Sequence, residues 1–117
     1  MLATGSALKV TIHLNRDTGA ASGFLVDEIL AFLLRRGIEG ATAIQAYAGY
    51  GAHRHLHTSG AGDVGGLHLP MIIYFIDQEQ KVEPILSELL SMVNDGLVEM
   101  HPTNVLRNIT SSEKVIS

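Results

Sequence analysis

Residues 49–57 read Gly-Tyr-Gly-Ala-His-Arg-His-Leu-His, and they hold the side chains of this 117-residue chain that are best suited to chemistry. Histidine recurs there at every second position, as His53, His55 and His57. In an extended backbone, side chains two residues apart point to the same side, so three imidazoles could approach one divalent metal ion. Without a fixed backbone the same histidines would be solvated side chains and no preformed site would exist. The pattern leaves a metal site and a polar loop as alternatives.

The same segment carries a guanidinium, that of Arg54, which could form two parallel hydrogen bonds with a phosphate or a carboxylate. A solvated loop arginine is the alternative. We recognise no nucleophile with its base and no pair of carboxylates with catalytic spacing, so the sequence predicts a binding protein rather than an enzyme. A composite-site enzyme of unknown reaction, with His57 and Asp63 as an acid/base pair across subunits, is a further alternative.

The amino-acid composition excludes several classes of partner and binding site. The net charge of -4, from 8 basic and 12 acidic residues, gives no basic field for a nucleic acid. The absence of cysteine excludes disulfides and thiolate zinc sites. No apolar run approaches the length of about 20 residues that spans a bilayer, and no signal peptide is recognisable, so we expect a cytoplasmic protein without membrane insertion. Hydrophobic residues make up 46% of the chain and charged residues 17%, which predicts self-association.

The helices and strands that position these residues can be predicted from the spacing of apolar residues along the chain. Alternation of apolar and polar residues predicts a strand over residues 8–14, and helical spacing predicts a helix over 22–36 with Ser22 as its N-cap. A weaker alternation predicts a second strand over 41–48. Residues 50–66 contain five glycines and no sustained apolar period, so we expect a long loop there.

The second half of the chain repeats this order. Residues 67–76 are apolar on both faces of a strand, which predicts burial on both sides. Asp77 is expected to cap a second helix, with Gln80 reaching back as in a capping box. Pro84 should kink that helix or separate its first turn.

A fourth strand is predicted over residues 97–101 and should end at Pro102, followed by a short edge segment and a polar tail over 108–117. The order of strand, helix, strand, strand, helix, strand predicts an α+β fold, the ferredoxin-like βαββαβ sandwich. Residues 1–117 would form one domain with an antiparallel four-stranded sheet and both helices on one face. The other face would be exposed in a monomer, so cyclic self-association is expected to bury it.

Five short motifs, in this order and spacing, resemble those of the PII-like proteins known as domain-of-unknown-function 190. The motifs are Gly49-Tyr50-Gly51, His57-Thr58, Leu69-Pro70, Ile76-Asp77 and Asp95-Gly96-Leu97-Val98. The resemblance covers residues 8–107 and implies a homotrimer. It also implies that a small anionic ligand, often an adenine nucleotide, binds between subunits beneath the 50–66 loop. Binding would order this loop, which would then contact and regulate another protein.

Residue by residue, the resemblance implies that Gly49 and Gly51 shape the base of the loop, where close backbone approach to a phosphate requires the absence of a side chain. The sequence departs from the PII pattern at His53, where PII proteins carry a glutamine, and at Leu97, where they carry a lysine. The predicted ligand-binding residues are Gly49, Gly51, His53, Arg54, His57 and Arg107. The alternative is a trimer resembling the CutA-type proteins, with His53, His55 and His57 as ligands of a divalent metal.

Overall fold

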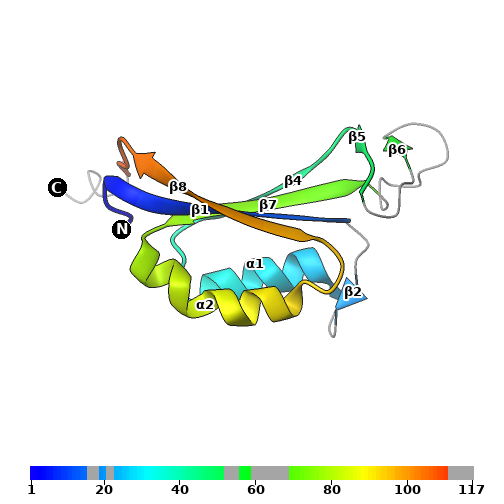
Figure 1. Cartoon of the computed structure of the whole chain (residues 1–117), viewed down its shortest axis with the longest axis horizontal. Helices are drawn as coiled ribbons and strands as arrows, with labels where there is room; N and C mark the ends of the chain where they lie inside the picture. The colour runs from blue at the N-terminus through cyan, green and yellow to red at the C-terminus, as the bar shows by residue number, and fades with distance from the viewer. Residues whose placement is uncertain (16–18, 21–22, 52–55, 59–68, 111–117) are drawn as a thin grey trace.

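A computed structural model of the chain describes residues 1–15, 19–20, 23–51, 56–58 and 69–110. The described residues form two layers, a four-stranded antiparallel sheet and two helices that lie on one of its faces (Figure 1). The strand order is β4-β7-β1-β8. The strands are β1 (Gly5–Asn15), β4 (Ala41–Gln45), β7 (Pro70–Asp77) and β8 (Leu97–Val105), and the helices are α1 (Leu25–Arg35) and α2 (Glu79–Met92). The predicted ferredoxin-like fold is confirmed.

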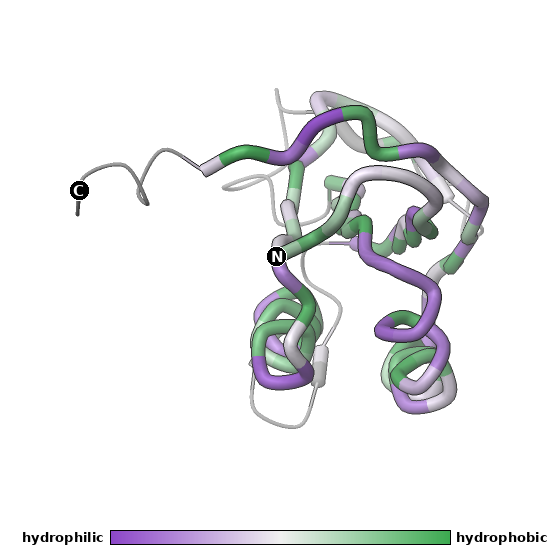
Figure 2. Tube along the Cα trace, turned by 90° about the vertical axis from the view of Figure 1, so that its left-hand side faces the viewer, coloured by the Kyte–Doolittle hydropathy of each residue, from purple (hydrophilic) through white to green (hydrophobic). Residues whose placement is uncertain are grey.

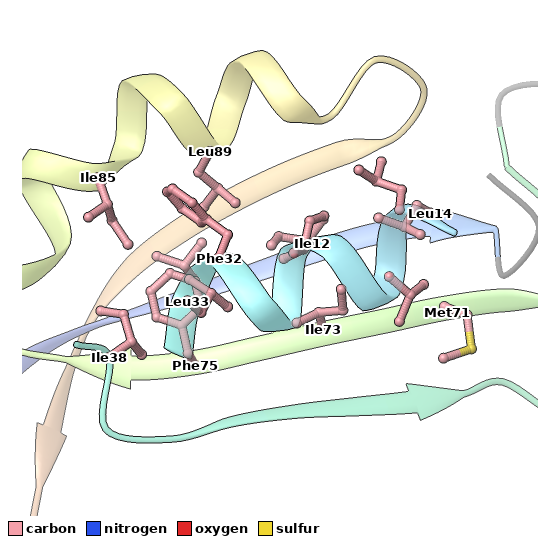
Figure 3. Close-up of a cluster of buried hydrophobic side chains, with 14 of the residues drawn as sticks. Ile12, Leu14, Phe32, Leu33, Ile38, Met71, Ile73, Phe75, Ile85 and Leu89 are labelled. Atoms are coloured by element: carbon pink, nitrogen blue, oxygen red, sulfur yellow. The ribbon is translucent and has the colours of Figure 1, made fainter. Parts of the chain in front are cut away.

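The core lies between the helices and the sheet. Alternate residues of the two central strands point toward the helices and are buried, and they meet buried side chains from both helices (Figure 3). Phe32, Ile73 and Leu89, one from each of three elements, are at most 2% exposed. Burying one such side chain contributes about 1.5–3 kcal/mol relative to leaving it in water, so this cluster dominates the folding free energy.

The first helix begins later than predicted. Its N-cap position is occupied by Phe24, which has an extended backbone and makes no side-chain capping bond, so the prediction of Ser22 as N-cap is wrong. The reason is a short antiparallel pair, β2 (Gly19–Ala20) with β3 (Gly23–Phe24), which holds the backbone extended up to the first helical residue. The helix ends at Arg35, one residue before the predicted end, with Arg36 as its C-cap residue. Gly37 follows as predicted, and its φ of 82° lies in the region that favours glycine.

The second helix is also capped differently from the prediction. Gln78 is its N-cap residue, and Gln80 donates to the Gln78 side chain at 3.3 Å instead of reaching back to Asp77. Asp77 is the last residue of β7 and is fully buried. Pro84 lies inside a helix that continues to Met92, and in Figure 1 the first turns (green) run at an angle to the rest (yellow).

Asp77 belongs instead to a polar network at the start of α2. Its carboxylate accepts the backbone N–H of Gln78 at 2.8 Å and that of Glu39 at 3.2 Å, and Lys81 Nζ lies 3.8 Å away. The carboxylate of Glu39 is 2.8 Å from the N-terminal ammonium of Met1. That hydrogen bond lowers the pKa of Glu39 below its usual value, although partial desolvation opposes the change. Asp77 thus joins the segment after α1 to the beginning of α2.

The two edge strands differ from their predictions. The strand predicted over residues 41–48 is divided into β4 and β5 (Ala48–Gly49). β8 does not end at Pro102 but passes through it to Val105. An edge strand tolerates proline because only one side of its backbone is paired.

No described segment covers the sheet face opposite the helices (Figure 2). On β7 the helix-facing residues are buried, while Ile72, Tyr74 and Ile76 on the open face are half-buried. In a single chain this strand is thus buried only on the side of the helices, and the burial of its other face by a second copy stays a prediction. Ile44 on β4 and Leu97 on β8 expose 48% and 55% of their surface. No helix in the described ranges is long and apolar enough to cross a membrane.

Candidate ligand-binding site at the base of the 50–66 loop

The base of the 50–66 loop is a short two-stranded arm at one end of the sheet (Figure 1). After β4, the N–H of Ala46 donates to the carbonyl of Pro70 at 2.9 Å, which anchors the chain to the first residue of β7. β5 then pairs antiparallel with β6 (His57–Thr58), with Gly49 opposite His57. The predicted 50–66 loop therefore contains one short strand, β6, which pairs with β5 just before the loop. We call residues 46–51 and 56–58 the loop base.

The two glycines of the loop base have different local surroundings. A Cβ at Gly49 would lie 3.1 Å from Cγ of Pro70, so packing against this ring already favours glycine. A Cβ at Gly51 would meet no atom within 4 Å, and its φ is not positive. Within the described chain, nothing requires glycine at position 51. Close approach of a ligand would supply a reason for the absence of a side chain there.

The loop base also exposes large apolar side chains. Tyr47, Tyr50 and Leu56 expose 80%, 66% and 69% of their surface. Tyr50 follows Gly49 and Leu56 precedes His57, so extending the register by one residue places these two residues across from each other, one on each segment of the arm. Exposed tyrosine rings can stack on a nucleobase or contact another protein. The exposure of Tyr47 is not predictable from the sequence, because the weak alternation over residues 41–48 does not reveal which face is open.

The structure brings together only some of the predicted ligand-binding residues. Gly49, Gly51 and the backbone of His57 meet in the loop base. The predicted residues His53 and Arg54 lie outside the described residues, as do His55 and Asp63 of the alternative predictions. Arg107 lies beyond the far end of β8.

The separation of Arg107 follows from strand length. β8 begins with Leu97, at the same end of the sheet as the loop base, and ends with Val105 at the other. Eight steps along a strand span about 26 Å. One chain therefore does not bring Arg107 to the loop base, and this residue could reach such a site only from another copy.

The turn between α2 and β8, which contains the PII-like motif of residues 95–98, packs tightly on β1. A Cβ at Gly96 would lie 2.4 Å from the carbonyl oxygen of His13, so no other residue fits without displacing backbone. Leu97 lies opposite His13 and is exposed. The turn is at the same end of the sheet as the loop base, but β1 and β7 lie between, a width of about 14 Å.

Charged groups gather on the β1–β8 half of the open face. Nε2 of His13 lies 3.2 Å from Oε2 of Glu99, and Nζ of Lys9 lies 4.9 Å from the centroid of the Tyr74 ring. His13 and Glu99 are about half exposed, so their hydrogen bond contributes little to stability by itself. The open face thus has a charged half and an apolar half, the latter formed by β4 and β7.

No group of three potential metal ligands occurs among the residues that the structure describes. Two of the three histidines of the predicted metal site, His53 and His55, lie outside those residues. The metal site stays a prediction.

Residues 7–105 match the sequence model of the family DUF190, "Uncharacterized ACR, COG1993". The UPF0166 protein of Aquifex aeolicus (strain VF5) is 32% identical over 71 residues, which make up 61% of this chain and 66% of that protein. The match thus spans just under two thirds of the relative's length.

Among solved structures, the fold is similar to that of CPII from Thiomonas intermedia K12. CPII bound to ADP and bicarbonate superposes with a TM-score of 0.59 and is 24% identical, covering 92% of this chain and 95% of CPII. A structure of CPII bound to ADP, AMP and bicarbonate gives a TM-score of 0.65 at 20% identity, covering 92% and 94%. CPII is described as a nitrogen regulatory PII-like protein. At this identity the similarity shows a shared fold.

Proposed function

This chain belongs to the DUF190 family of PII-like proteins, and from that premise we propose that it is a homotrimeric sensor of a small anionic ligand. The ligand is an adenine nucleotide, bound between subunits at the loop base, and the 50–66 loop transmits binding to a partner protein. The observation that carries the proposal is the similarity over 92% of this chain to CPII, whose structures contain ADP, AMP and bicarbonate.

The loop base has features that suit such a ligand. Gly51 leaves its backbone open to a phosphate, and the exposed rings of Tyr47 and Tyr50 offer flat apolar surfaces to an adenine. Arg54, within the loop, would supply a guanidinium for phosphate oxygens or for bicarbonate. Arg107 of a neighbouring subunit would supply a second one, since within its own chain it lies at the far end of β8.

The proposal is tested by isothermal titration of the purified protein with ADP, AMP and ATP, each with and without bicarbonate. We expect saturable binding of at least one nucleotide. Gly51→Val should weaken it at least tenfold, because the new side chain would occupy the space required by the phosphate.

Gly40→Val is the matched control for that variant. A Cβ at Gly40 would also meet no atom within 4 Å, its φ is not positive, and it lies between α1 and β4, outside the loop base. This variant should bind the nucleotide as the wild type does. Wild-type affinity in Gly51→Val, or the absence of binding by every nucleotide, would contradict the proposal.

The signalling step requires the 50–66 loop to respond to the ligand. Hydrogen exchange of peptides covering this loop, measured with and without the nucleotide, should decrease upon binding, while peptides from the buried face of α1 should not change. Equal exchange in both states would leave a nucleotide-binding trimer without the proposed signal.

A further inference from the structure

The charged half of the open face is formed by ionisable side chains of β1 and β8. Buried residues of β1 such as Ile12 point toward the helices, so the residues between them, which include Lys9 and His13, lie on the open face. Residues that are directly opposite each other in a ladder share a face. The register of β1 and β8 therefore places Glu99 and His101 on the open face as well.

The histidines of this face have different neighbours. Nε2 of His13 lies 3.2 Å from Oε2 of Glu99, so a positive charge on this imidazole would meet a carboxylate. His101 lies directly opposite Lys9, so a positive charge there would meet a second positive charge. Like charges directly opposite each other destabilise a sheet. Protonation is thus compensated at His13 and opposed at His101.

The ammonium group of Lys9 has an aromatic partner on the neighbouring strand. Its Nζ lies 4.9 Å from the centroid of the Tyr74 ring, which is a cation–π contact. Such a contact is worth more when water is removed from it. The ring therefore supports a positive charge on Lys9 when the face is covered, and this charge is the one that His101 faces.

In a single chain, water weakens the interactions among these charges. His13 and Glu99 are about half exposed, and His101 is exposed. The apolar half of the open face begins on β7, which lies next to β1 at a distance of about 5 Å. A second copy that covers the apolar half would therefore also remove water from the charged half, and charges interact more strongly where water is excluded.

We propose that protonation of His101, opposite Lys9, weakens the assembly of this chain, so that the homotrimer dissociates more readily in mild acid than at neutral pH. The inference deepens the proposed function and rests on its homotrimer, because it names a regulation of that assembly and of the nucleotide bound within it. Histidine is the side chain that ordinarily changes its charge between about pH 5 and 8. The response would thus fall in the range of pH found in cells.

The direction of the effect follows from the number of bound protons in each state. In separate chains, water surrounds His101, and its positive charge costs little. In the assembly, the loss of water and the ammonium group of Lys9 both oppose that charge. Separate chains then bind more protons than assembled ones, so acid shifts the equilibrium toward separate chains. Protonation of His13 lacks this effect, because the carboxylate of Glu99 offsets the charge.

The experiment measures dissociation of the full chain at two pH values. Urea-induced dissociation, followed by light scattering at a fixed protein concentration, gives a midpoint at about pH 8 and at about pH 6. We expect the midpoint of the wild type to fall in acid. His101→Gln keeps a polar side chain that gains no charge, and it should remove at least half of this fall. Other groups titrate in the same range, so the difference between the two proteins carries the result.

Variants on the same face identify the pair of residues responsible. His13→Gln can still donate to Glu99, and it should retain most of the fall. Glu99→Gln should enlarge the fall, because His13 then gains its charge without a carboxylate beside it. Lys9→Met removes the opposing ammonium, so adding it to His101→Gln should reduce the fall no further than His101→Gln does alone. A merely structural role of His101 would change the midpoint equally at both pH values.

The outcomes separate this inference from the proposed function. An equal fall in the wild type and in His101→Gln would overturn the inference, and the proposed function would stand if the assembly still binds nucleotide at neutral pH. If the fall depends on His101 and Lys9 but no nucleotide binds, the inference stands and the proposed ligand is wrong. A chain with the mass of a monomer at both pH values would contradict both.

Discussion

The contact between Gly96 and β1 leads to a quantitative prediction for Gly96→Ala. The added methyl group would lie 2.4 Å from the carbonyl oxygen of His13, whereas an ordinary contact begins near 3.4 Å, so one of the two must move by about 1 Å. The carbonyl belongs to the β1–β8 ladder and cannot withdraw without loosening it. Cγ1 of Val93 at 3.2 Å and Cβ of Leu14 at 3.4 Å leave no lateral space.

Overpacking of this kind costs about 1–3 kcal/mol of the free energy of unfolding. For a domain near 100 residues, each kcal/mol lowers Tm by about 4–8 °C, so we expect Tm of Gly96→Ala to fall by about 4–24 °C. Calorimetry at fixed protein concentration measures this change, since association also affects Tm.

The control for this prediction is Gly51→Ala, whose methyl group would meet no atom within 4 Å. Its Tm should stay within about 2 °C of the wild type or rise slightly, because alanine restricts the unfolded chain. Equal Tm values for Gly96→Ala and Gly51→Ala would refute the argument that backbone approach requires glycine at position 96.

Three further predictions concern side chains. Asp77→Asn removes a buried charge that accepts two backbone N–H groups, so it should reduce the free energy of unfolding by about 1–3 kcal/mol in urea titrations, and an unchanged midpoint would contradict the role of the network. Glu39→Gln should remove a stabilising contribution that is present above the ordinary glutamate pKa, near 4.5, and is lost as pH falls through the lowered pKa of Glu39. The Tm difference between this variant and the wild type should therefore shrink in acid. A constant difference would count against the ion pair between Glu39 and the N-terminal ammonium. If His53, His55 and His57 hold a metal, zinc should bind at a fixed stoichiometry, and this binding should disappear when all three are replaced by alanine. Unchanged zinc binding by the triple variant would exclude these histidines as ligands.

The element order and the core were predictable because they depend on periodicity. Alternation in β1 and helical spacing in α1 report directly which side chains are buried, and Ile12, Phe32 and Leu33 are buried as the pattern indicates. The ends of elements were less predictable because they depend on distant residues. Asp77 resembles an N-cap in sequence, but its carboxylate accepts an N–H from Glu39, 38 residues away. Pro102 resembles a strand end, but at an edge its missing donor costs no ladder bond.

The sequence predicted where the candidate site lies, but only some of the residues that form it. Glycine content located the loop base, since glycine marks backbone that must bend or be approached closely. It did not show that Gly49 packs on Pro70 or that Tyr47 and Tyr50 are exposed, because both facts depend on the pairing of β5 with β6. The distance of Arg107 from the loop base likewise follows from the direction of β8, which no local pattern reports.

Ligand binding and assembly are linked if one subunit completes the site of another. A ligand that contacts two subunits stabilises their contact by the same factor by which the contact increases ligand affinity. Burial of the open face of the sheet, where Ile44 and Leu97 are exposed in a single chain, would supply association energy for the proposed homotrimer. A nucleotide bound between subunits would add to it. The apparent nucleotide affinity should then rise with protein concentration near the dissociation constant of the assembly, which a site contained within one chain would not show.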